Sequence, residues 1–129
     1  MILLWDSSTM TAHVTFVHDD GTKNTHEWEA GRTLARDMLA HLRDLLAKES
    51  LTFTNLTAIG VKRGPGSYTG LRIGMTVLNT LASAEHIAIV GAIGNAWQDD
   101  CLRRLASGED DKVVLPEYGG DANITQPRK

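Results

Sequence analysis

The sequence RGPGSYTGLRIG, residues Arg63 to Gly74, joins an apolar run to a segment with helical periodicity. Its glycines permit backbone conformations that other residues avoid, and the N-terminus of the following helix attracts anions. The stretch is therefore a candidate phosphate-binding loop, in which the members that would hold the anion are Gly64, Gly66, Ser67, Thr69 and Gly70. It is not a Walker A loop, since no Gly-Lys-Ser/Thr sequence follows.

The same residues also suit a tight turn between a strand and a helix, and this is the interpretation that we favour. In that interpretation Ser67 or Thr69 is the N-cap of the helix, and Gly74 allows a neighbouring segment to approach closely. The two interpretations predict different chemistry from one local structure, and the sequence leaves both open.

Asp6 belongs to the same question because it ends the first apolar run, 2–5, and is followed by Ser7-Ser8-Thr9. At the carboxyl end of a strand it could orient a phosphate or a metal-bound water. Alternatively it forms an Asx turn that caps the backbone of Ser8 or Thr9. Nuclease chemistry would need several converging carboxylates, and nothing in the sequence places Glu27 or Asp99 beside Asp6.

Hydrophobic periodicity predicts one domain over residues 1–106 and a linker, short strand and irregular tail over 107–129. The predicted order is β-β-β-α-β-α-β-α with a mixed five-stranded sheet, the plan of the ribonuclease H-like fold within the actin-like ATPase superfamily. The predicted strands are 2–5, 12–17, 23–28, 58–62 and 87–93, with another at 112–115. The predicted helices are 32–48, 71–84 and 96–106, the last with Asn95 as its N-cap.

The helix at 71–84 differs from the helix at 32–48. Apolar residues of the earlier helix span an arc of roughly 140°, whereas those of the later helix span roughly 200°. Arg72 is the one strongly charged residue between 71 and 84. A helix this apolar is expected to be covered on two sides, by its own sheet and by a partner.

Composition narrows the functional classes. The chain has 129 residues, 42% of them hydrophobic, a net charge of −3 and one cysteine, Cys101. Scattered basic residues predict no nucleic-acid binding by the chain alone, and the absence of an 18-residue apolar run predicts no membrane span. We expect a cytoplasmic protein without a disulfide framework. The five histidines show no metal-binding spacing, and Cys101, Trp5, Trp28 and Trp97 are predicted core residues.

The glycine-rich stretch after the apolar run 58–61 resembles the signature of the TsaB (YeaZ) family, which takes part in making threonylcarbamoyladenosine in tRNA. The opening sequence ILLWDSST is similar to the family's first strand and following turn. The helices and the segment Ile89-Val90-Gly91 follow in the family's order, so the resemblance covers about residues 1 to 95.

This resemblance implies a non-catalytic subunit that binds and activates TsaD, the enzyme that transfers threonylcarbamoyl to adenosine 37 of tRNA. TsaD holds its metal with a His-x-x-x-His motif, which is absent here. A small ATPase, TsaE, would join the complex, and tRNA, ATP and Mg²⁺ would be reached only through it. Pairing would use the first two helices, as would a homodimer, and the predicted interface residues are Leu34, Met38, His41, Leu71, Arg72, Met75, Leu78 and Asn79.

The chain also departs from the family. The family's usual His-Ser/Thr-x-x-Leu-Leu-Pro sequence at the first helix is replaced by Ala30-Gly31-Arg32-Thr33-Leu34-Ala35-Arg36. Most of the second half is missing, and only Leu115-Pro116-Glu117-Tyr118 is similar to the family's C-terminal segment. We therefore expect a shortened, single-domain version in which the cleft between domains is incomplete. The alternative function is a nucleotide-binding ATPase remnant that uses the glycine-rich loop.

Overall fold

The computed structural model describes residues 1–117. Its strands are β1 (Ile2–Asp6), β2 (Thr11–Val17), β3 (Lys23–Glu29), β4 (Ala58–Gly64) and β5 (Ala88–Ile93). Its helices are α1 (Leu34–Lys48), α2 (Tyr68–Glu85) and α3 (Trp97–Ala106), with short 3-10 turns η1 (Gly31–Thr33) and η2 (Phe53–Asn55). Most of the predicted irregular tail, 116–129, lies outside the described residues.

The five strands form one mixed sheet in the order β3-β2-β1-β4-β5. The first three strands pair antiparallel, and β1–β4 and β4–β5 pair parallel across helical connections. This order makes β1 the central strand, with Asp6 opposite His13 of β2 and Trp5 opposite Val61 of β4. The predicted element order and the mixed five-stranded sheet are confirmed.

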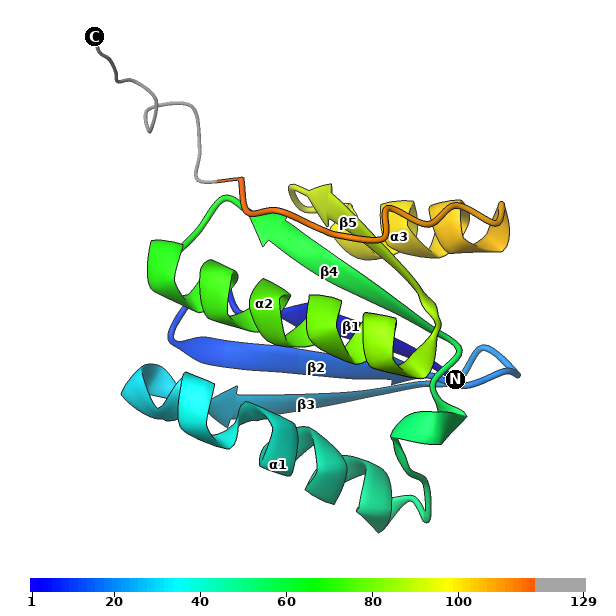
Figure 1. Ribbon diagram of the computed structural model, residues 1–129, viewed down its shortest axis with the longest axis horizontal. Coiled ribbons are helices and arrows are strands. Elements are labelled where there is room, and N and C mark those ends of the chain that lie inside the picture. The colour runs from blue at the N-terminus through cyan, green and yellow to red at the C-terminus, as the bar shows by residue number, and fades with distance from the viewer. Residues whose placement is uncertain (118–129) are drawn as a thin grey trace, which may run out of the picture.

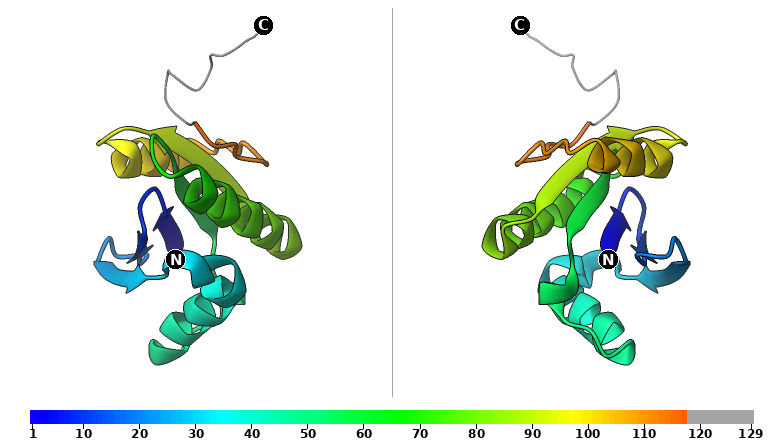
Figure 2. Two further views of the ribbon diagram at one scale, coloured as in Figure 1. Left: turned by 90° about the vertical axis from the view of Figure 1, so that its left-hand side faces the viewer. Right: turned by 90° about the vertical axis from the view of Figure 1, so that its right-hand side faces the viewer.

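Helices cover both faces of the sheet (Figures 1 and 2). Alternate residues of a strand point to opposite faces. Leu3 and Trp5 join the main core beneath α1 and α2, whereas Leu4 joins a second cluster with Trp97 and Cys101 of α3. The carboxyl ends of β1 and β4 and the start of α2 therefore meet at one end of the sheet.

Two local predictions are wrong. Asn95 is not the N-cap of α3, since Ala96 occupies that position without a side-chain cap. Residues 112–115 form no strand. The segment 109–117, which we call the strap, runs back beside β5 toward the end of β4, as the orange trace in Figure 1 shows. It is held mainly by side chains, so it makes no regular ladder.

Candidate functional site

The glycine-rich loop is a strand-to-helix turn joined to the β1–β2 turn. Ser67 is the N-cap of α2, with its hydroxyl accepting from the Gly70 amide at 3.4 Å. The Ser67 amide in turn donates to the Ser8 carbonyl at 2.7 Å. A Cβ atom on Gly66 would overlap Ser8, and one on Gly70 would overlap the Ser7 carbonyl. Close approach between two loops thus accounts for both glycines.

Asp6 stabilises the β1–β2 turn from within. Its Oδ1 accepts from the Ser8 amide at 2.9 Å and from the Ser8 hydroxyl at 2.6 Å. Its Oδ2 lies 3.9 Å from the Lys62 ammonium. This is the Asx turn that the sequence offered as the structural alternative, with Ser8 as the capped residue. Asp6 therefore has structural partners for both carboxylate oxygens.

Ser7 ties the turn to α2. Its hydroxyl donates to the Gly70 carbonyl at 2.8 Å and accepts from the Trp5 indole at 2.9 Å. Gly74 lies directly above this pair, because a Cβ on Gly74 would come within 2.5 Å of the Ser7 Oγ and of the Trp5 Nε1. The predicted close packing at Gly74 is confirmed, and its neighbour is the β1–β2 turn.

A cleft of about 280 Å³ opens beside the loop. It combines hydroxyl groups with one cationic and several apolar side chains, and its lining includes Ser7, Thr9, Met10, Arg32, Leu34, Ser67, Thr69 and Ile73. Within residues 1–117, no group of three or more His, Cys, Asp or Glu side chains is placed to hold a metal ion. Phosphate binding by the loop stays a prediction. The structural roles of its glycines and of Asp6 explain these residues without a phosphate.

The predicted partner interface divides into buried and exposed parts. Five of its members are at most 5% exposed and lie in the core of this domain, namely Leu34, Met38, Leu71, Met75 and Leu78. All five belong to the main hydrophobic core between the two helices and the sheet. These five side chains cannot meet a partner directly, and this part of the prediction is corrected.

The other three predicted members lie in different places. His41 stacks on Trp28 of β3 with ring centroids 4.3 Å apart, on the inner side of α1. Asn79 exchanges two hydrogen bonds with the Val114 backbone, at 2.8 and 3.0 Å, and so holds the strap. Arg72, on α2, is the one exposed residue among the eight predicted interface members, and its guanidinium lies 3.4 Å from the Tyr68 hydroxyl.

The structure instead exposes an apolar surface on the outside of α1 and α2. A groove of about 460 Å³ is lined by Ala35, Tyr68, Thr69, Arg72, Ile73, Thr76 and Val77. Leu39, one helical turn beyond Ala35, is 48% exposed, and Tyr68 is 55% exposed. We call Leu39 and the residues lining the groove the outer helix surface. The breadth of the α2 arc was the signal for it, since one sheet face cannot cover an arc of roughly 200°.

Other predicted residues have structural roles. Trp5 and Trp97 are buried, and Trp28 is half-buried against α1. Cys101 is fully buried, and burial raises the pKa of its thiol to about 11. None of the helices among residues 1–117 has the length and apolar character needed to cross a membrane.

Comparison with known proteins agrees with this architecture. Residues 28–92, half of the chain, match the family model described as TsaD, tRNA N6-adenosine threonylcarbamoyltransferase. The chain is 29% identical over 131 residues to the tRNA threonylcarbamoyladenosine biosynthesis protein TsaB of Escherichia coli (strain K12), covering 95% of this chain and 56% of that protein. The TsaB protein of Haemophilus influenzae is 28% identical over 89 residues, covering 69% of this chain and 37% of that protein.

Solved structures show the same relationship. YeaZ from Pseudomonas aeruginosa superposes with a TM-score of 0.67 at 29% identity, covering 81% of this chain and 49% of that chain. A second protein, described as similar to peptidase YEAZ from Pseudomonas aeruginosa, gives a TM-score of 0.65 at 32% identity, covering 71% and 42%. The chain spans about half the length of the relatives it matches. Because the family model spans half of the chain and these relatives are TsaB or YeaZ proteins, the chain belongs to the TsaB/YeaZ family.

Proposed function

We propose that the chain is a non-catalytic subunit that binds and activates a TsaD-like threonylcarbamoyltransferase in the modification of tRNA. The relatives named for threonylcarbamoyladenosine biosynthesis support the pathway. The single observation that supports a partner role for this chain is the outer helix surface, an apolar groove flanked by exposed Leu39 and Tyr68. A TsaE-like ATPase and the tRNA would be reached through the complex, in the cytoplasm.

The outer helix surface has the composition of a protein-binding site. Exposed apolar and aromatic side chains surround a groove, and Arg72 at its edge offers a guanidinium to an acidic or carbonyl group. Aromatic residues and arginine are enriched where proteins bind one another, and exposed apolar patches mark such sites. The same surface would support a homodimer when the TsaD-like subunit is absent.

Co-purification tests the proposal. The chain is mixed with the TsaD-like subunit encoded in the same genome, and the mixture is passed over a sizing column. We expect one co-eluting complex, and we expect tRNA threonylcarbamoylation to depend on this chain when the remaining components are supplied. Separate elution of the two proteins, or modification at full rate without the chain, would overturn the proposal.

The alternative is nucleotide binding by the loop, and calorimetric titration with ATP and Mg²⁺ separates it from the partner role. We expect no heat of binding to the isolated chain, since Gly66, Gly70 and Asp6 are engaged by the β1–β2 turn. Saturable binding that is lost in a folded Ser67→Ala or Thr69→Ala variant would favour the nucleotide-binding function instead.

A further inference from the structure

The two edge strands of the sheet, β3 and β5, differ in how readily they could pair with a strand of another chain. β3 has the sequence KNTHEWE, with exposed Lys23, Glu27 and Glu29. β5 has the sequence AIVGAI, without a charged residue or proline. Charged residues on an edge strand discourage pairing with another chain, and short apolar segments of low charge favour it. β5 therefore needs protection from outside its own sequence.

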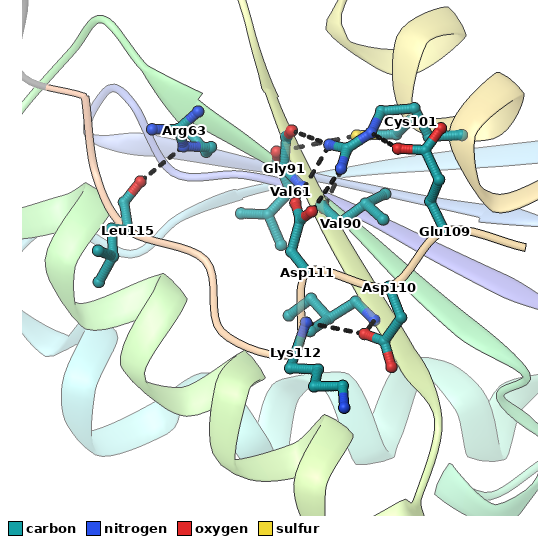
Figure 3. Close-up of polar contacts among 12 residues, drawn as sticks. Val61, Arg63, Val90, Gly91, Cys101, Glu109, Asp110, Asp111, Lys112 and Leu115 are labelled. Carbon is teal, nitrogen blue, oxygen red and sulfur yellow. Dashed lines mark hydrogen bonds and ion pairs between the residues drawn. The ribbon is translucent and has the colours of Figure 1, made fainter.

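The strap supplies that protection along the outer edge of β5 (Figure 3). The Ile89 amide donates to Asp110 Oδ1 at 3.1 Å, and the Ile89 carbonyl accepts from the Asp111 amide at 2.8 Å. The Gly91 amide donates to Asp111 Oδ2 at 3.0 Å, and the Gly91 carbonyl accepts from Arg104 Nη1 at 2.8 Å. The strap supplies three of these four partners and Arg104 of α3 supplies the fourth. Only the Asp111 amide is a backbone group, so the strap caps β5 without extending the sheet.

Arg104 and Asp111 hold this cap together. The Arg104 guanidinium pairs with Asp111 and, through Nε at 2.8 Å, with Glu109. Burial alone would raise the pKa of Asp111, but hydrogen bonds from Arg104 and from the Gly91 amide outweigh it and hold that pKa below its usual value. The carboxylate is therefore ionised at neutral pH and available to both partners.

The far end of the strap is anchored independently. Asn79 of α2 holds Val114, which is 2% exposed, and the Arg63 Nε donates to the Leu115 carbonyl at 2.8 Å. The Glu117 amide donates to the Arg63 carbonyl at 2.7 Å. Loss of the Arg104–Asp111 pair would therefore release the part of the strap beside β5 while 114–117 stays attached.

We propose that the strap is an autoinhibitory guard that prevents β5 from pairing with β5 of a second copy of this chain. A second β5 would satisfy the same amides and carbonyls of Ile89 and Gly91 by backbone bonds, so the strap and the second copy exclude one another. A second copy fits because antiparallel pairing of identical apolar edges about a two-fold axis is self-complementary. This site is separate from the outer helix surface and does not depend on the proposed function.

Hydrogen exchange of the peptide that spans β5 tests the guard. The full chain is compared with Arg104→Ala and Asp111→Ala over an about hundredfold range of protein concentration. In both variants we expect β5 amides to exchange about tenfold faster or more at low concentration, because charge-assisted bonds are lost. Protection should return at high concentration together with a higher oligomer on a sizing column.

Arg103→Ala is the matched control, since Arg103 neighbours Arg104 but, within residues 1–117, forms an ion pair only with Asp100 on the exposed side of α3, at 3.5 Å. It should exchange like the unmodified chain. If Asp111→Ala fails to fold, Asp111→Asn replaces it, since asparagine keeps the shape of the side chain and loses the charge. We then expect a smaller increase in β5 exchange at low concentration, and again protection with a higher oligomer at high concentration. Unchanged β5 exchange at low concentration, or fast exchange at every concentration, would overturn the proposal.

Discussion

At the scale of the residue, glycines of the loop region are explained by what lies against them. Gly74 sits above the Trp5–Ser7 hydrogen bond with no room for a Cβ atom. Gly64 has a φ of +140°, a conformation that L side chains rarely adopt, and a Cβ there would overlap the Glu117 carbonyl. Both positions require glycine for structural reasons that involve no ligand.

Gly74→Ala is expected to destabilise the protein although alanine favours helices. The gain in helix propensity is about 1 kcal/mol, whereas displacing Trp5 and Ser7 from a packed core costs about 1–3 kcal/mol and weakens their hydrogen bond by about another 1 kcal/mol. Urea unfolding should show a lower midpoint with an unchanged slope. Ser83→Ala, at an exposed position of α2, is the control and should leave the midpoint unchanged or slightly higher. An unchanged or raised midpoint for Gly74→Ala would contradict the packing.

His41 makes the stability depend on pH. Burial lowers its pKa, with Lys48 and His26 acting in the same direction and Asp44 opposing them, and its Nε2 is buried without a hydrogen-bond partner among the described residues. Because the folded-state pKa lies below the usual 6.5, the unfolded chain binds the proton more readily. The contribution of His41 is therefore complete above pH 6.5 and decreases as the pH falls below it.

The measurement is the free energy of unfolding between about pH 7.5 and 5.5, a range chosen around the ordinary histidine pKa. We expect His41→Gln to lose part of the decrease seen in the unmodified protein, whereas His86→Gln, at an exposed position, should retain it. Identical pH profiles for the unmodified protein and His41→Gln would show that this histidine does not titrate differently on folding.

At the scale of the element, α2 presents two different faces. Leu71, Met75 and Leu78 form its buried stripe, and Arg72, Thr76 and Val77 lie on the outer helix surface. A change on the buried stripe therefore acts on folding, and a change on the outer helix surface acts on association.

Leu78→Ala is expected to lower the free energy of unfolding by about 2–5 kcal/mol, because it leaves a cavity in the core. Val77→Ala should cost clearly less, since Val77 is only partly buried and lines the groove. Thermal or urea unfolding of the two variants distinguishes the faces. Equal losses would mean that α2 is rotated relative to the structure described.

At the scale of the whole molecule, the fold was predicted well from the sequence. Each strand and helix buries one of its faces, and the spacing of the apolar residues on that face identifies the type of element. Residues 112–115 of the strap were mispredicted as a strand, because they include Val113, Val114 and Leu115. The strap is attached by the side chains of Asp110 and Asp111, which bond β5, and of Asn79, which bonds Val114. Each of these contacts joins residues that are distant in sequence, so hydrophobic periodicity does not indicate them.

The candidate site was predicted less well for a related reason. Helical periodicity identifies an apolar arc but does not say which part of it meets the sheet. Leu39 belongs to the same arc as Met38, yet it is 48% exposed while Met38 is fully buried. Only the packing of α1 beside α2 separates core positions from the outer helix surface.

The most direct test of the partner role is the affinity of the chain for the TsaD-like subunit after one change on the outer helix surface. Leu39→Asp adds a charge to an exposed apolar position of the outer helix surface. Ala40→Asp is the control, because Ala40 is also exposed but lies about 100° further round α1, away from Ala35. Calorimetric titration should show binding weakened by about tenfold or more for Leu39→Asp, about 1.4 kcal/mol. Near-normal binding is expected for Ala40→Asp, with both variants as stable as the unmodified chain. Binding of Leu39→Asp at unmodified affinity, or no binding by the unmodified chain, would contradict the account.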